Sequence, residues 1–144
     1  MPADMFLKLD TIVGESEDRE HPGWIEVDSF SWGLANAGSF GGGGSGGGKT
    51  TFQDFHFTMV FQKVSPVLFL SCAKGEHIKS AELSVRVPGG NEETFYKVML
   101  EDVLLSSYQS GGSEGLVPTD QFSLNFAKIE FNGRSFDTRT NESA

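Results

Sequence analysis

The sequence predicts a small, mainly antiparallel β protein, either a barrel or a sandwich, with one inserted helix. Apolar and polar residues alternate with period two along most of the chain, as is typical of half-buried strands, and only residues 65–75 carry helix start and stop signals. The 144 residues include 13 Phe, 2 Trp and 2 Tyr. These aromatics suffice for one sizeable core, so we expect a single domain over residues 1–144.

The N-terminal part of the chain is expected to contain one regular and one irregular strand. Residues 5–9 carry apolar side chains at every second position. Within residues 24–33 the apolar parity changes midway, so a strand there requires a bulge or a bend. The positions concerned are Ile25 and Val27 on one parity and Phe30 and Trp32 on the other.

The clearest core signal lies in the strand predicted for residues 55–61. Phe55, Phe57, Met59 and Phe61 share one parity and alternate with His56, Thr58 and Val60. A strand of this pattern has one heavily aromatic face, which we expect to be buried.

Residues 65–75 are predicted to form the helix. Ser65 suits the N-cap, Pro66 suits the first helical position, and Gly75 suits the position just past the end. Apolar side chains occupy nearly every side of this short segment. We therefore expect the helix to pack against the rest of the protein.

The remainder of the chain is predicted to form strands over residues 80–87, 94–107 and 122–131. The last of these changes apolar parity midway, which indicates a second bulge. From residue 132 onward the chain is polar apart from Phe136, and we expect its end to fray. The positions predicted to face the core include Ala81, Leu83, Val85, Tyr96, Val98, Leu100, Leu104, Phe122, Leu124, Phe126, Ile129 and Phe131.

The charge balance argues against nucleic acid and anionic membranes as partners. The formal net charge is −9, and residues 1–28 alone hold eight acids against two bases. Such a chain is repelled by polyanions. The acidic segment Glu15, Glu17, Asp18 and Glu20 favours a solvated loop, with a docking surface for a basic partner as the alternative.

Residue patterns that carry catalysis or bind metals are missing from the sequence. His21, His56 and His77 lie far apart, and none is at chelating distance in sequence from Cys72. Cys72 lies in the apolar helix, where a buried inert thiol is the simplest interpretation. We therefore expect no enzymatic activity, no metal and no cofactor. No apolar run is long enough to span a membrane or to serve as a secretion signal, so membrane insertion and a cleaved leader are not expected.

The glycine run at residues 41–48 superficially resembles a phosphate-binding loop, because Lys49 and Thr50 follow it. A phosphate loop requires a helix immediately afterwards, so that backbone N–H groups converge on the anion. Residues 52–61 alternate like a strand instead. The run is therefore interpreted as a mobile arm.

Several segments resemble the Hcp family, the haemolysin-coregulated proteins of bacterial type VI secretion. They occur in the same order and with similar spacing from about residue 3 to residue 131. The segments are 4–10 (DMFLKLD), 14–16 (GES), 29–33 (SFSWG), 65–66 (SP), 72–75 (CAKG), 100–107 (LEDVLLSS) and 124–127 (LNFA).

The resemblance implies a two-sheet antiparallel β-barrel with a lateral helix at residues 65–75. It also implies six copies in a ring, and rings that stack into the inner tube of the secretion apparatus. The partners implied are further copies of the chain, the contractile sheath, the spike protein and effector proteins carried in the lumen. The protein would begin in the bacterial cytoplasm and leave with the ejected tube, without a signal peptide.

The resemblance assigns the connection 34–50 to an extended loop that reaches a neighbouring protomer or ring. The chain departs from the family there, because its glycine run is unusually long. Backbone ordering costs more for glycine than for any other residue, so we expect this loop to order only on stacking. The residues expected to contribute to this inter-ring loop are Gly41, Gly42, Gly43, Gly44, Ser45, Gly46, Gly47, Gly48 and Lys49.

Alternation also selects candidate lumen residues. If Phe30 and Trp32 face the core, Ser29 and Ser31 face away from it. A small polar surface suits a channel wall that passes cargo without adhering to it, although the same serines would also suit an outer surface.

Two other functions remain open at this stage. The aromatic face of residues 55–61 would suit a monomeric β-barrel that binds an apolar ligand. An adhesin-like extracellular β domain is a weaker alternative.

Overall fold

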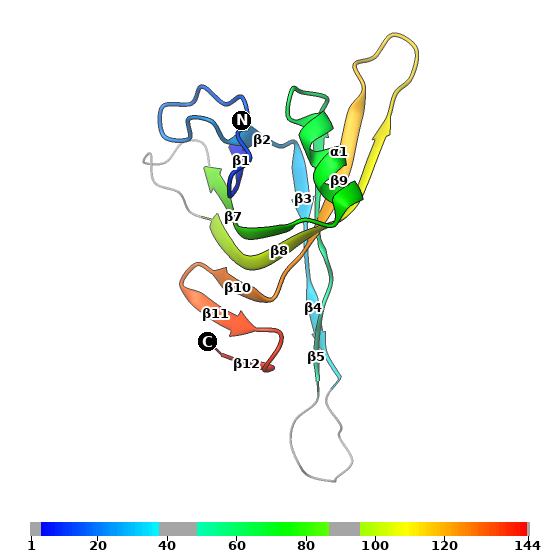
Figure 1. Ribbon diagram of the computed structural model, residues 1–144. Helices are drawn as coiled ribbons and strands as arrows, with labels where there is room; N and C mark the ends of the chain where they lie inside the picture. Colours follow the sequence, from blue (N-terminus) through cyan, green and yellow to red (C-terminus); the bar gives the residue numbers. More distant parts are fainter. Residues whose placement is uncertain (1–3, 38–48, 87–95, 144) are drawn as a thin grey trace.

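The computed structural model describes residues 4–37, 49–86 and 96–143, and these residues form twelve strands and one helix (Figure 1). All strand pairs are antiparallel. The elements are β1 (Asp4–Leu9), β2 (Ile25–Glu26), β3 (Ser29–Ser31), β4 (Leu34–Asn36), β5 (Thr50–Phe52), β6 (Phe55–Val60), α1 (Ser65–Lys74), β7 (His77–Arg86), β8 (Tyr96–Gly111), β9 (Thr119–Asn125), β10 (Lys128–Phe131), β11 (Arg134–Asp137) and β12 (Glu142–Ser143).

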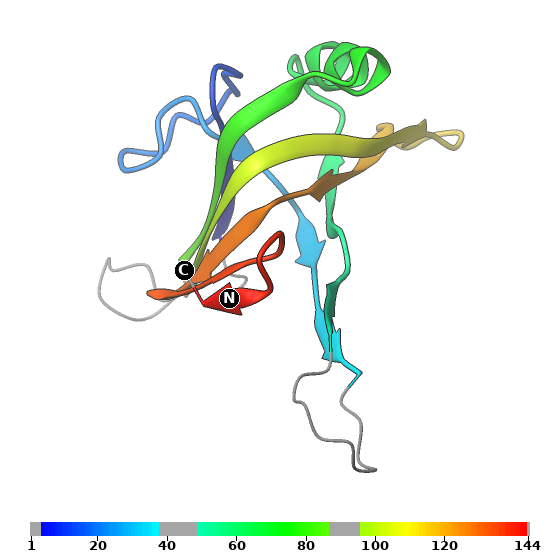
Figure 2. The same ribbon diagram turned by 60° about the horizontal axis from the view of Figure 1, so that its bottom comes forward.

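The strands form two sheets, as predicted for a mainly β protein. Ten strands belong to one sheet, and seven of them follow the order β12-β11-β10-β8-β7-β1-β2. A branch begins at β8, where β9 pairs with β8, β6 pairs with β9, and β3 pairs with β6. Strands β4 and β5 form a separate two-stranded sheet. Figure 2 shows the large sheet curving strongly along β7 and β8. Its ladder is not closed in the described residues, because β2 pairs only with β1 and β3 only with β6.

The predicted aromatic face of β6 lies in the core. Phe55, Phe57 and Met59 are each at most 1% exposed. Phe57 stacks on Phe122 of β9, with ring centroids 5.2 Å apart. Phe61 does not follow the prediction. Because β6 ends at Val60, the Phe61 side chain lies beyond the strand and is 51% exposed.

The first parity change corresponds to a bend between β2 and β3. The Val27 N–H donates to the Met5 carbonyl of β1 at 3.2 Å, and the next residue, Asp28, donates to the Thr58 carbonyl of β6 at 2.8 Å. The chain thus passes from one part of the sheet to another within two residues. This change of partner moves the apolar face from Val27 to Phe30, which packs against the core.

Two further irregularities explain the later parity changes. Between β9 and β10 the chain leaves the ladder at residues 126–127 and pairs again with the other end of β8. In β8 itself, Asp102 has a φ of +53°. Past this point Val103 and Leu105 are buried and Leu104 is only half-buried, so the prediction that Leu104 faces the core was wrong.

The helix lies where it was predicted, but its N-terminus differs. Val64 is the N-cap residue and makes no capping bond through its side chain, while Gly75 ends the helix with a φ of +63°. The Ser65 hydroxyl instead donates to Asp120 of β9 at 2.5 Å. Ser65 is thus the first helical residue and not the N-cap, and its hydroxyl bonds to a distant carboxylate.

The C-terminal segment is more regular than expected. Strand β11 pairs along the full length of β10, and β12 pairs with β11. Phe136 lies half-buried against the core, with its ring 5.6 Å from that of Phe52. In the parts of the chain that the structure describes, no helix has the length and apolarity needed to cross a membrane.

Candidate functional site

The outward face of β3, β6, β9 and β8 carries a polar surface, which we call the polar face. Its side chains come from two rows of directly paired residues. One row is Ser29, Thr58, Gln121 and Gln109, and the other is Ser31, His56, Ser123 and Ser107. No residue in these two rows is apolar, and only His56 is ionisable.

Alternation produces the polar face because the intervening residues lie in the core. The row between the two polar rows is Phe30, Phe57, Phe122 and Tyr108. These rings point inward, so the neighbouring side chains point to the opposite face of the sheet. Ser123 is nevertheless buried there, with its hydroxyl hydrogen-bonded to those of Ser106 and Ser107. Ser29 and Ser31 are both exposed, in agreement with the predicted direction of their side chains.

Asp54 closes one end of the polar face. Its Oδ2 accepts a hydrogen bond from Ser106 at 2.6 Å, and its Oδ1 accepts one from Asn125 at 3.0 Å. The Ser106 hydroxyl also lies 2.7 Å from that of Ser123. The carboxylate is therefore held by both oxygens at the edge of the face.

A narrow arm projects from the body of the protein at the ends of the predicted 34–50 connection (Figures 1 and 2). These ends pair with each other as β4 and β5, and Asn36 donates to the Thr50 hydroxyl at 3.3 Å. Lys49 is exposed, and its carbonyl accepts from Ala37 at 3.3 Å. The glycines predicted to form an inter-ring loop lie at residues 41–48, outside the described residues.

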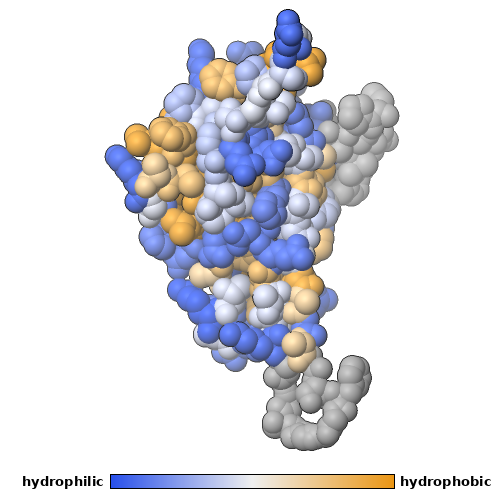
Figure 3. Space-filling model, turned by 90° about the vertical axis from the view of Figure 1, so that its right-hand side faces the viewer, coloured by the Kyte–Doolittle hydropathy of each residue, from blue (hydrophilic) through white to orange (hydrophobic). Residues whose placement is uncertain are grey.

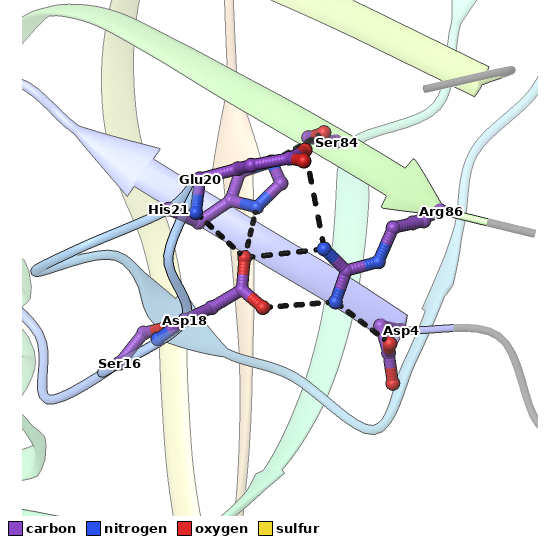
Figure 4. Close-up of polar contacts among 7 residues, drawn as sticks. All are labelled: Asp4, Ser16, Asp18, Glu20, His21, Ser84 and Arg86. Atoms are coloured by element: carbon purple, nitrogen blue, oxygen red, sulfur yellow. Dashed lines mark hydrogen bonds and ion pairs between the residues drawn. The ribbon is translucent and has the colours of Figure 1, made fainter. Parts of the chain in front are cut away.

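The acidic segment 15–20 is anchored to the sheet, which the sequence analysis did not foresee (Figure 4). Asp18 accepts hydrogen bonds from both terminal nitrogens of Arg86 in β7, at 2.9 and 3.3 Å, and from His21 Nδ1 at 2.9 Å. Arg86 also donates to Asp4 at 2.9 Å. In the sequence, the only indication of this pairing is that Arg86 occupies one of the positions in residues 80–87 that are expected to face away from the core. Its partner is 68 residues away.

The electrostatics of this cluster follow from the charge pairing. Hydrogen bonds from Arg86 and then from His21 hold the pKa of Asp18 well below its usual range. The same carboxylate, followed by Asp4, raises the pKa of Arg86. Asp18 is thus paired within the molecule, whereas Glu15, Glu17 and Glu20 of the same segment are exposed.

His21 is a buried structural residue. Its ring stacks on Phe6 with centroids 4.3 Å apart, and its Nε2 lies 2.9 Å from the Ser84 hydroxyl. With Nδ1 bonded to Asp18, both ring nitrogens are occupied. Among the residues that the structure describes, no group of three His, Cys, Asp or Glu side chains could hold a metal ion.

Helix α1 presents an apolar surface to solvent. The helix packs against the protein as expected, but Val67, Phe69 and Leu70 are each about half exposed. Only its inner side is covered, with Leu68 fully buried and Cys72 half-buried. Figure 3 shows apolar side chains gathered over this part of the molecule, at the left of the view. Exposed apolar groups of this extent are typical of protein contact surfaces.

Asp120 of β9 holds the first residue of the helix. Its side chain is fully buried, and it accepts from Ser65 at the start of α1. Burial, followed by the proximity of Asp120, raises the pKa of Tyr108. This buried carboxylate therefore attaches the start of α1 to β9.

These features define a class of protein. A mainly β domain with a polar sheet face, a projecting hairpin and a half-exposed apolar helix works through contacts with other proteins.

Comparisons with known proteins are consistent with this class. A sequence model of the family described as "Type VI secretion system effector, Hcp" matches residues 6–132. The protein Hcp1 of Pseudomonas aeruginosa is 40% identical over 135 residues, which cover 90% of this chain and 82% of that protein.

Solved structures agree in fold. A structure described as a type six secretion system protein has a TM-score of 0.90 at 25% identity and covers 99% of this chain and 100% of its own. Hcp1 of Salmonella typhimurium has a TM-score of 0.84 at 26% identity, with the same coverage. The chain therefore belongs to the Hcp family of type VI secretion, a family of secreted structural proteins.

Membership decides between the functions left open by the sequence. It supports a structural subunit of the type VI tube over a monomeric barrel for an apolar ligand. The core agrees, because the aromatic face of β6 is already covered by Phe30 and Phe122 and is not available to a ligand.

Proposed function

We propose that six copies of this chain form a ring, that rings stack into the inner tube of a type VI apparatus, and that the polar face lines the channel. The polar face is the observation on which this proposal depends. Hydroxyl and amide groups bind water well and offer no apolar area to a passing protein, which suits a conduit for folded cargo. The subunit performs this task without catalysis.

We also infer that each subunit is a barrel in its overall course. Val27 and Asp28 are consecutive in sequence but donate to β1 and β6 respectively. The bent segment 25–31 therefore links the two parts of the sheet that the ladder leaves separate. A barrel of this kind is stiff, as a tube wall must be.

The arm supports contacts between copies. It projects from the body, and its strands pair only with each other among the described residues. On the second edge of β5 the Thr50 N–H donates to Asn141 at 3.3 Å, which leaves the second edge of β4 for strand addition. Free edges are a common means of joining copies of a protein. We propose that the arm, with the loop that includes Gly41–Gly48 and Lys49, reaches a neighbouring ring.

The remaining partners follow from this role. We propose that the outer surface of the tube contacts the contractile sheath, that its end contacts the spike protein, and that effector proteins occupy the lumen next to Ser29 and Ser31. The protein would accumulate in the bacterial cytoplasm and be ejected with the tube.

Native mass measurement tests the ring. With a chain mass of 15.6 kDa, six copies give about 94 kDa. A monomer under all assembly conditions would contradict the proposal.

The substitution Ser31→Gln tests the channel wall. The larger side chain should leave the ring intact and change the amount of co-expressed effector that co-elutes with it. Ser113→Gln, on the exposed β8–β9 turn, serves as the control and should change neither. Loss of the ring in the Ser31 variant would place this residue in a subunit interface instead.

A further inference from the structure

His56 lies on the polar face, as the second residue of β6. Its directly paired neighbours are Ser31 on β3 and Ser123 on β9. Thr58 shares its face along β6, and Asp54 directly precedes the strand. The imidazole is exposed, and the paired residue on each side of it is a serine.

The charged groups near His56 are few. Strand β3 contributes only Ser29 and Ser31 to this face, and β9 contributes only Gln121, Ser123 and the adjacent Asn125. Beyond β9, the paired positions of β8 are Ser107 and Gln109. Among the described residues, Asp54 is the one fixed charge on the face, and both its oxygens already accept hydrogen bonds.

Histidine is the side chain whose ordinary titration falls between about pH 5 and pH 8. A proton on His56 would change the charge of the polar face from one negative to zero and would place a cation two residues from Asp54. The protonated ring donates from both nitrogens, which suits a carboxylate.

We propose that the polar face binds acidic protein segments through protonated His56 and releases them as the pH rises. This inference depends on the proposed function, because it assigns the cargo surface of the channel to this face. In a ring, six such imidazoles would line one level of the channel. An otherwise strongly acidic protein would then attract acidic cargo at this level only below neutral pH.

A labelled peptide measures this effect directly. The probe is fluorescein-labelled decaglutamate, and its affinity for the assembled protein is measured by fluorescence anisotropy at about pH 5.5 and about pH 8. We expect affinity that is about two- to fivefold higher at the lower pH, which is the range for an exposed ion pair. His56→Gln should remove this difference, and His56→Lys, charged throughout, should bind tightly at both pH values.

His77→Gln is the matched control, because His77 is also exposed but lies at the start of β7, off the polar face. It should behave as the wild type does. An unchanged pH response in His56→Gln, or no binding of the probe at either pH, would overturn the inference. Native mass, measured on the same samples, reports separately on the ring. A monomer whose pH response depends on His56 would contradict the proposed tube and leave the role of His56 standing.

Discussion

The link between Asp18 and Arg86 is expected to account for a large part of the stability of the N-terminal region. Side chains of Asp18 and Arg86 are 18% and 23% exposed. The carboxylate accepts three hydrogen bonds from charged or ionisable donors. The substitution Asp18→Asn keeps the shape of the side chain and removes its charge.

The magnitude follows from the number of bonds and their burial. A hydrogen bond to a charged group contributes about 1.5–3 kcal/mol, and such contributions do not add fully within one cluster. Partial exposure lowers them further. We expect Asp18→Asn to lower the free energy of unfolding by about 2–4 kcal/mol, which for a domain of this size lowers Tm by about 6–12 °C.

Urea unfolding at about pH 7 measures the loss, with Glu17→Gln as control. Glu17 is an exposed acid in the same segment, so its variant should stay within about 0.5 kcal/mol of the wild type. A loss in Asp18→Asn no larger than that of the control would refute the structural role assigned to the ion pair.

The pH dependence provides a second check on Asp18. Because its pKa is lowered in the folded state, the ionised form stabilises the fold above the unfolded value of about 3.9, and this contribution is lost as the pH falls below it. The difference between wild type and Asp18→Asn should therefore be constant from about pH 8 to pH 5 and narrow in more acidic solution. A difference that grew on acidification would contradict the sign.

Two further predictions concern packing and assembly. Gly14→Ala should lower the free energy of unfolding, measured in urea, by about 1–3 kcal/mol. A Cβ at this position would lie 2.5 Å from the Trp24 carbonyl oxygen, a backbone atom that cannot move aside. A variant as stable as the wild type would show that the backbone relaxes. Six copies at −9 each carry about −54 per ring, so added salt should strengthen stacking, as seen in sedimentation velocity. Weaker stacking at high salt would point to attractive ion pairs between rings.

Local sequence patterns predicted the elements correctly where the determining forces are local. Alternation identified β6 and its buried face, and Gly75 identified the end of α1, because a strand pleat and a left-handed C-cap depend on neighbouring residues only. The direction of Ser29 and Ser31 followed from the same alternation. The sequence also showed where the apolar parity changes. It did not show whether each change is a bulge or a change of pairing strand, because both give the same residue pattern.

The candidate sites were less predictable, because they depend on pairing between distant strands. Ser31, His56 and Ser123 form one row only after β3, β6 and β9 have paired. The acidic segment 15–20 was predicted to be a solvated loop, because its pattern contains no sign of Arg86. This arginine, which neutralises Asp18, lies on β7, 68 residues further along the chain.

The sequence by itself therefore determined the fold class, the position of the helix, the outward direction of the serines and the resemblance to the family. Each of these depends on periodicity, on residues a few positions apart, or on motifs in fixed order. The tertiary structure alone decided that Phe61 is exposed, that Asp120 anchors the helix and that His56 lies on the same polar patch as Asp54. These outcomes depend on where strands end and which strands meet, and that is settled by packing of the whole core.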